Sequence, residues 1–185
     1  MRKMGLVAAI VASIVVVPGA PAFAEERVCR GTIGARTVDN VRVPQGATCT
    51  LNGTFVKGTV KVKRAATLMA IDVRVIGNVQ GENAENVVVR ASSRVGGSVQ
   101  VVQGERARVA NSRVGGDVQF DENDGRVSVV SSRIDEDVQA FQNTGGVTIR
   151  DNRIEGNLQC KANSPRPNGG GNVVHGNKED QCKRL

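Results

Sequence analysis

Aromatic side chains are scarce in this chain of 185 residues. It contains no Trp, no Tyr, four Phe and a single histidine, His175. A sugar held in a catalytic cleft commonly stacks on an aromatic ring, and a histidine metal centre needs several histidines. The four cysteines include no Cys-x-x-Cys pair, which also argues against a zinc site. We therefore predict no metal site and no cofactor.

Long apolar runs are also missing. The longest one, Gly5–Val17, is shorter than the roughly 20 residues that span a bilayer. Two basic residues precede it and the small-residue site Ala22-Phe23-Ala24 follows, a pattern typical of a secretory signal peptide. We predict a signal peptide at 1–24, no membrane insertion, and a secreted protein that is extracellular or associated with the cell surface. In a source with an outer membrane, the periplasm is the equivalent location.

Concentrated positive charge is limited. The formal net charge is +7, of which Arg2 and Lys3 would be lost with the signal peptide. The densest basic cluster is Lys61–Arg64, and no aromatic residues interleave with it. Nucleic-acid binding is therefore not expected, whereas the mild positive surplus suits anionic polymers or ordinary solubility.

A repeat with a period near 20 residues dominates what is present. Successive copies lie 20, 19, 20 and 20 residues apart, at Val79-Gln80, Val99-Gln100, Val118-Gln119, Val138-Gln139 and Leu158-Gln159. Such a period is typical of a solenoid, in which each unit buries its apolar face only by stacking on its neighbours. Apolar and polar residues alternate within each repeat, which predicts β-strands.

Alternation also predicts which side chains point inward. Two apolar rows should stack inside the coil: Val75, Val95, Val114, Ile134 and Ile154; and Val79, Val99, Val118, Val138 and Leu158. Three polar rows should lie outside, together on one side of the solenoid. We name them the Arg row (Arg74, Arg94, Arg113, Arg133, Arg153), the Gln row (Gln80, Gln100, Gln119, Gln139, Gln159) and the Asn/Asp row (Asn78, Ser98, Asp117, Asp137, Asn157).

Four cysteines give a second clue. Cys29 and Cys49 are 20 residues apart, and Cys160 and Cys182 are 22 apart, close to one repeat in each case. Adjacent coils are separated by about 4.8 Å, which approaches the Cα separation of about 5.5 Å that a disulfide prefers. Of the three possible connectivities, only Cys29–Cys49 with Cys160–Cys182 matches the repeat.

These patterns define one domain at 25–185. We predict an all-β parallel β-helix of about eight coils, linked by a disulfide at both ends, with an N-terminal capping coil at 25–53, repeat coils at 54–160 and a loop-rich C-terminal capping coil at 161–185. Within that last coil, Lys161–Asn172 is rich in Pro and Gly and is expected to form a mobile excursion.

The outer rows allow two interpretations. Identical residues align automatically when a unit is duplicated, so the rows can be purely structural. Alternatively, they form a polar binding strip. Five like charges about 5 Å apart are unfavourable without anions between them, so the Arg row is the better candidate. The predicted ligand-binding residues are Arg74, Arg94, Arg113, Arg133, Arg153, Gln100, Gln119 and Gln139.

Enzymatic activity is not expected. Asp117 and Asp137 fall in neighbouring coils and could form a carboxylate pair, but their proximity also follows from the repeat. His175 has no partnered nucleophile motif such as Gly-x-Ser-x-Gly. A polysaccharide-active enzyme therefore ranks below both a binding module and a structural extracellular protein with no ligand.

Several local motifs resemble a family. They are Cys29-x-Gly31-Thr32-Ile33, Val43-Pro44-x-Gly46-Ala47-Thr48-Cys49, Gly156-Asn157-Leu158-Gln159-Cys160 and Gly176-Asn177-Lys178-Glu179-Asp180-Gln181-Cys182. They look like an uncharacterised group of secreted bacterial β-helical proteins, which implies a right-handed parallel β-helix and export. Bactofilins are similar only in fold type, since this chain has a signal peptide pattern and paired terminal cysteines.

The sequence thus predicts a secreted, non-enzymatic surface or matrix binding module, monomeric, whose partner is an anionic cell-wall polymer or polysaccharide.

Overall fold

The computed structural model describes residues 25–185, so the predicted signal peptide lies outside the described residues. Within this range the chain forms 25 short strands and no α-helix. It consequently has no helix of the length and hydropathy needed to cross a membrane among the residues described. All strand pairs are parallel, and they form three sheets of nine, eight and eight strands.

Each sheet collects every third strand of the chain. Sheet A contains β1 (Glu26–Val28), β4 (Asn40–Val43), β7 (Val60–Val62), β10 (Val79–Glu82), β13 (Val99–Val102), β16 (Val118–Asp121), β19 (Val138–Phe141), β22 (Leu158–Lys161) and β25 (Lys178–Asp180). Sheet B contains β2 (Gly31–Ile33), β5 (Thr48–Asn52), β8 (Thr67–Ile71), β11 (Asn86–Arg90), β14 (Arg106–Ala110), β17 (Val127–Val130), β20 (Val147–Arg150) and β23 (Asn168–Gly170). Sheet C contains β3 (Thr37–Val38), β6 (Phe55–Val56), β9 (Arg74–Val75), β12 (Arg94–Val95), β15 (Arg113–Val114), β18 (Arg133–Ile134), β21 (Arg153–Ile154) and β24 (Val173–Val174).

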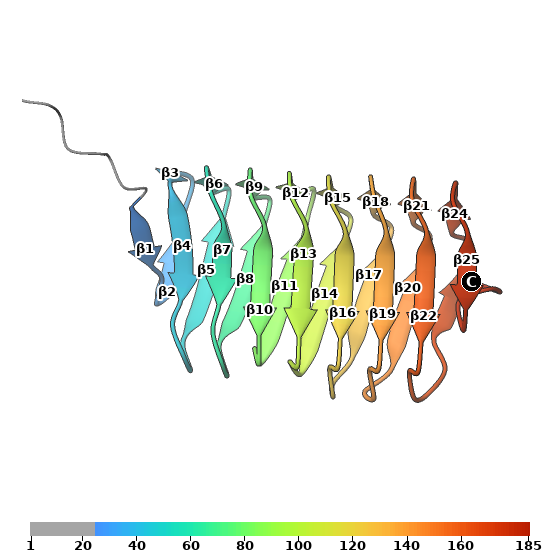
Figure 1. Cartoon of the computed structure of the whole chain (residues 1–185). Helices are drawn as coiled ribbons and strands as arrows, with labels where there is room; N and C mark the ends of the chain where they lie inside the picture. Colours follow the sequence, from blue (N-terminus) through green and yellow to red (C-terminus); the bar gives the residue numbers. More distant parts are fainter. Residues whose placement is uncertain (1–24) are drawn as a thin grey trace, which may run out of the picture.

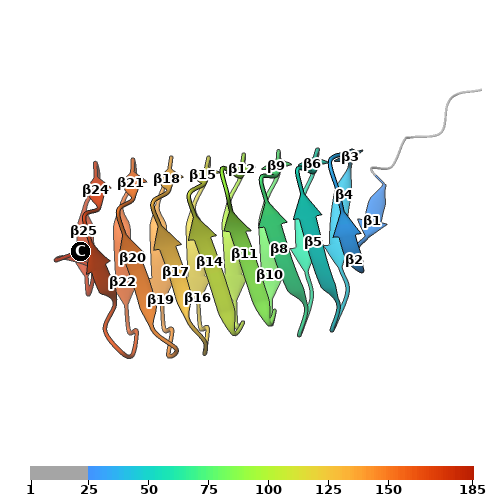
Figure 2. The same cartoon turned by 180° about the vertical axis from the view of Figure 1, so that it is seen from behind.

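The chain passes from sheet A to B to C and then begins the next coil. Figure 1 shows the strands of sheet A in a row with the short strands of sheet C at one edge, and Figure 2 shows sheet B from behind. The coils stack in sequence order from one end of the molecule to the other. The predicted parallel β-solenoid of about eight coils, with a period near 20, is therefore confirmed.

The core is a narrow column of aliphatic side chains. Val95 pairs with Val75 and Val114, and Val99 pairs with Val79 and Val118, so the two predicted inner rows exist in the expected register. All of these side chains are at most 2% exposed. A third inner row comes from sheet B, where Val89 pairs with Val109. Every coil contributes to one continuous apolar cluster.

Corners between the sheets are closed by polar side chains. Between sheets A and B, Asn143 accepts a hydrogen bond from the backbone N–H of Asn123 at 3.0 Å and donates to the carbonyl of Phe120 at 2.9 Å. Asn123 and Asn163 make equivalent bonds, and all three are at least 95% buried. Between sheets B and C, Asn152 repeats the arrangement by donating to the carbonyl of Val129. These side chains pair backbone groups that would otherwise be buried without a partner.

Both ends are cross-linked as expected. The disulfides are Cys29–Cys49 and Cys160–Cys182, with Cα–Cα distances of 5.6 and 5.2 Å, so the predicted pairing is confirmed. At the C-terminal end, Leu185 joins the apolar cluster and Lys178 Nζ donates to its carbonyl.

One expectation about this end requires correction. Lys161–Asn172, expected as an excursion, contains β23, which pairs with β20 in the same register as every earlier coil. Asn163 and Asn172 at its two ends are buried and bond to Ala140 and Ile149 of the preceding coil. The Pro and Gly residues suggested a loop, but these corner contacts hold the segment in the solenoid.

Candidate anion-binding groove

The Arg row lies where the repeat placed it. Arg94 pairs with Arg74 and Arg113, and Arg133 pairs with Arg113 and Arg153, all at the first position of a two-residue strand in sheet C. The second residue of each strand is buried, so the arginine at the first position points outward and is exposed.

Carboxylates neutralise one end of this row. Asp135 Oδ2 lies 2.8 Å from Arg113 Nη2, and Asp135 Oδ1 lies 3.1 Å from Arg133 Nε. Glu155 Oε1 lies 2.9 Å from Arg133 Nη2 and 3.0 Å from Arg153 Nε, and Glu155 Oε2 lies 2.7 Å from His175 Nδ1. The two acids thus alternate with Arg113, Arg133 and Arg153 along the row, and their negative charges reduce the repulsion expected among these arginines.

These contacts lower the pKa of both carboxyl groups, Asp135 and Glu155. Partial burial would raise the pKa of Asp135, but hydrogen bonds from Arg113 and Arg133 outweigh it and hold that pKa below its usual value. The hydrogen bond from Arg153 lowers the pKa of Glu155, with the charges of Arg153, His175 and Arg133 adding to the effect. Both acids therefore stay ionised in mildly acidic solution.

The other end of the row differs. Arg74 lies over the ring of Phe55, 5.3 Å from its centroid, which is a cation–π distance. Arg94 makes no ion pair or side-chain hydrogen bond with any other residue of 25–185. Where Asp135 and Glu155 stand in later coils, the coils of Arg94 and Arg113 have Gly96 and Gly115.

These two glycines are required by the close stacking of the coils. A Cβ on Gly96 would approach the carbonyl oxygen of Ile76, and one on Gly115 that of Gly96, more closely than real Cβ atoms do. No acidic side chain can therefore be placed beside Arg94 at these positions without moving the backbone.

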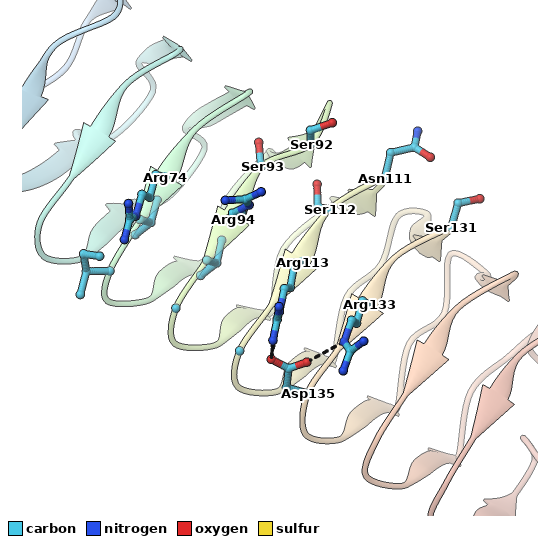
Figure 3. Close-up of a pocket in the computed structure, with 15 residues that line it drawn as sticks. Arg74, Ser92, Ser93, Arg94, Asn111, Ser112, Arg113, Ser131, Arg133 and Asp135 are labelled. Carbon is cyan, nitrogen blue, oxygen red and sulfur yellow. Dashed lines mark hydrogen bonds and ion pairs between the residues drawn. The ribbon is translucent and has the colours of Figure 1, made fainter.

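A groove of about 900 Å³ covers this part of sheet C, lined by Arg74, Arg94, Arg113, Arg133 and Asp135, by Ser92 and Asn111, and by the glycines. Figure 3 shows Asp135 contacting both Arg113 and Arg133, whereas no contact is drawn to Arg74 or Arg94.

Ala91 and Ser92, at the rim of this groove, both have positive φ, 60° and 64°. Val89 and Val109 are partners, as are Arg94 and Arg113, so this coil holds one extra residue at the rim of the groove.

The Gln row lies in sheet A, and its amides are used largely against one another. Gln80 Nε2 donates to Gln100 Oε1 at 3.1 Å, and Gln139 Nε2 donates to Gln159 Oε1 at 3.2 Å. Gln100 makes a longer contact of 3.5 Å with Gln119. The half-buried amides therefore reinforce the stacking of the coils, as the structural interpretation of this row would have it.

The Asn/Asp row occupies the corner between sheets C and A rather than an open surface. Asn78 Oδ1 accepts from the Ser98 N–H at 2.8 Å, Asp117 Oδ1 from the Asp137 N–H at 3.0 Å, and Asp137 Oδ1 from the Asn157 N–H at 2.6 Å. These side chains close the corner by accepting backbone N–H groups of the next coil. The expectation that all three rows lie on one side is thus wrong. The Arg row belongs to sheet C and the Gln row to sheet A, and the Asn/Asp row forms the corner between these two sheets.

The sequence prediction did not identify Phe55, Asp135 or Glu155. Their signal was nonetheless present, since Asp135 and Glu155 each follow an Arg of the row by two residues and therefore face the same side of an extended segment. Phe55 occupies the Arg-row position one coil before Arg74.

Within residues 25–185, no group of three or more His, Cys, Asp or Glu side chains is arranged to hold a metal ion. The arginines, the rim residues and the glycines thus form a basic groove that extends over several coils of sheet C. Comparisons with models of protein families, with curated proteins and with solved structures gave no match to this chain.

Proposed function

We propose that this protein is a non-enzymatic binding module for an anionic cell-envelope polymer or polysaccharide, which it binds in the sheet C groove. The single observation that carries the proposal is the unpaired guanidinium of Arg94, which lies between Arg74 and Arg113 in an open groove of about 900 Å³. Guanidinium groups bind carboxylate, sulfate and phosphate oxygens through two parallel hydrogen bonds.

The groove matches a polymer better than a small molecule. Its arginines repeat about every 4.8 Å along the solenoid axis, so an extended chain laid along the axis can place anionic groups beside several of them. The serine and asparagine side chains of the rim, such as Ser92 and Asn111, provide donors and acceptors for hydroxyl groups. Affinity then comes from many weak contacts and depends on salt.

Export is part of the proposal. The residues at 1–24 have the pattern of a signal peptide, and the two disulfides are typical of proteins that fold in an oxidising compartment. The resemblance to secreted bacterial right-handed β-helical proteins supports an extracellular or cell-surface location, or a periplasmic one where an outer membrane exists. We place the protein there as a monomer.

The carboxylates of the Asn/Asp row are consistent with a binding role without catalysis. Asp117 and Asp137 use an oxygen each to accept backbone N–H groups, so their geometry serves the fold. Asp135 in the groove and Glu155 farther along the Arg row are held by arginines, which favours their ionised forms and suits neither to act as a general acid.

Co-sedimentation with isolated cell walls and with anionic polysaccharides across a salt series tests the proposal. The purified, oxidised protein should pellet at low salt and be released as salt rises, and an Arg94→Ala/Arg113→Ala/Arg133→Ala variant should pellet less and be released at a lower salt concentration. A neutral polysaccharide serves as the ligand control. Absence of pelleting, or equal pelleting of both proteins, would contradict the proposal.

The second candidate function is a structural extracellular protein with no ligand. It is favoured by the ion pairs that already occupy Arg113, Arg133 and Arg153 and by the self-pairing of the Gln row. A negative result in the co-sedimentation assay would select it.

A further inference from the structure

A second group of arginines lies on sheet B, away from the repeat rows. Arg106 and Arg108 are on β14, and Arg126 immediately precedes β17 on the next coil, where its carbonyl accepts the N–H of Ala107. All three side chains are exposed. None of them forms an ion pair or side-chain hydrogen bond with another residue of the described chain.

These arginines surround a groove of about 350 Å³ that runs across four coils. Its lining also includes Asn86, Val88, Ser128, Val130, Thr148 and Arg150. Among the described residues that line it there is no Asp or Glu, in contrast to the sheet C groove with its Asp135. Arg150 makes the one ion pair at the rim, 3.5 Å from Asp151.

The floor of this groove is apolar. Val88 and Val130 occupy outward positions of their strands, because Val87 and Val129 beside them face the core, yet they are only 8% and 6% exposed. Guanidinium groups at the rim, hydroxyls of Ser128 and Thr148, and valine methyl groups at the base together suit a sugar ring that bears an anionic substituent.

Adjacent arginines without acids repel one another. Arg106 and Arg126 lie on neighbouring coils, about 4.8 Å apart along the axis, and Arg108 lies on the same face as Arg106. On sheet C, Asp135 and Glu155 reduce the repulsion among the arginines, but the sheet B groove has no such acids. The positive charge of this surface is therefore available to a ligand.

We propose that the sheet B groove is a second site for anionic polysaccharide, and that the protein cross-links polymer chains by holding one segment on sheet B and another on sheet C. The cross-linking part rests on the proposed function of the sheet C groove. Both grooves follow the solenoid axis over overlapping coils, β9 to β18 for sheet C and β11 to β20 for sheet B. They lie on two different sheets joined by a corner at Asn111, so two polymer segments can lie side by side along one molecule.

Two variants separate the sites. The sheet B variant is Arg106→Thr/Arg108→Thr/Arg126→Thr, and the sheet C variant is Arg74→Thr/Arg94→Thr. Thr suits these positions because Thr67 and Thr148 occupy equivalent places on sheet B, and Thr37 does so on sheet C. An Arg30→Thr/Arg36→Thr/Lys183→Thr variant removes the same charge as the sheet B variant, from exposed positions near the ends of the solenoid. Circular dichroism and thermal melting verify that each variant folds.

The first readout is the stoichiometry of a short dextran sulfate oligosaccharide, measured by titration calorimetry. The intact protein and the charge-matched control should bind two molecules, and each groove variant should bind one. The second readout is turbidity with long dextran sulfate, with neutral dextran as a control. The intact protein should give a turbidity maximum at intermediate ratios, and either groove variant should lose at least nine-tenths of it.

The outcomes distinguish the two proposals. One bound oligosaccharide, lost in the sheet C variant and kept in the sheet B variant, would overturn the sheet B site and leave the proposed function intact. One bound oligosaccharide lost in the sheet B variant alone would support the sheet B site and overturn both the sheet C groove and cross-linking. Loss of binding in both variants would indicate a single site shared across the corner, and no binding by the intact protein would overturn both proposals.

Discussion

Arg113 on β15 and Asp135, which follows β18 on the next coil, form an ion pair with an Nη2–Oδ2 distance of 2.8 Å. The same carboxylate also binds Arg133, so one acid holds two members of the Arg row. This contact divides the row into a neutralised end and a free end at Arg74 and Arg94.

Replacing Asp135 should therefore extend the free end. Asp135→Asn removes the negative charge and releases Arg113 for an anionic ligand, whereas Arg133 keeps its pair with Glu155. We expect affinity for an anionic polysaccharide to rise about threefold to tenfold, while the free energy of unfolding falls by about 1 kcal/mol or less, because the pair is partly exposed. Binding titrations and denaturant melts check both changes. Unchanged affinity would mean that the ligand does not reach this part of the row.

Asp135 and Glu155 should make the free energy of unfolding depend on pH. Because the pKa values of Asp135 and Glu155 are lowered in the folded state, their contribution is complete above their unfolded pKa values of about 4. It is lost as the pH falls through the lower folded values. Asp121, whose pKa is raised by burial and by Glu122, contributes with the opposite sign.

Denaturant melts between pH 2 and pH 7 isolate the effect when the intact protein is compared with Asp135→Asn. The intact protein should lose more stability below about pH 4 than the variant does. Parallel curves for the two proteins would show that the Asp135 contacts do not stabilise the fold.

The buried asparagines of the corners should be needed for stability. Asn143→Ala leaves the Asn123 N–H without its partner and removes one hydrogen bond from the Phe120 carbonyl, and an unpaired buried group costs about 1–3 kcal/mol. We expect a loss of about 2–4 kcal/mol in the free energy of unfolding. Thr144→Ala, at the exposed neighbouring position, is the matched control and should change stability by less than about 0.5 kcal/mol. Equal losses for the two variants would refute this role for the amide.

Removing a disulfide should loosen one end of the solenoid and leave the middle intact. Each coil contacts mainly its neighbours, and closing a loop of 20 residues, as Cys29–Cys49 does, stabilises by about 3 kcal/mol. In Cys29→Ser/Cys49→Ser, hydrogen exchange should accelerate in β1 and β2, with little change in β13 and β16. Faster exchange throughout would show instead that the solenoid unfolds as one unit.

Much of the architecture follows from the sequence because the repeat aligns equivalent residues. The inner row at Val95 and the Arg row are direct consequences of period two combined with period 20. The disulfide Cys29–Cys49 follows from the same period, since the two residues are one coil apart.

The rest depends on corners and on contacts between unlike positions. Asn123 stands in a run of polar residues, yet it is fully buried, because its amide bonds to the carbonyl of Val101 and to the side chain of Asn143. Arg106 and Arg126 are one period apart, but the equivalent positions of the two preceding coils hold Asn86 and Thr67, so no row of like residues marks them in the sequence. The extra residue at Ala91 is likewise visible only once the strand register is known.

The central claim is that the free end of the Arg row binds an anionic polymer. The most direct measurement is a titration of Arg74→Thr/Arg94→Thr and of Arg133→Thr/Arg153→Thr with a short dextran sulfate oligosaccharide, both in the Arg106→Thr/Arg108→Thr/Arg126→Thr background that leaves only sheet C. Each pair removes the same charge from the same sheet, but Arg133 and Arg153 already bind Glu155. The account predicts a loss of at least tenfold in affinity, about 1.4 kcal/mol, for the first pair and a loss under threefold for the second. Equal losses for the two pairs, or none for either, would contradict it.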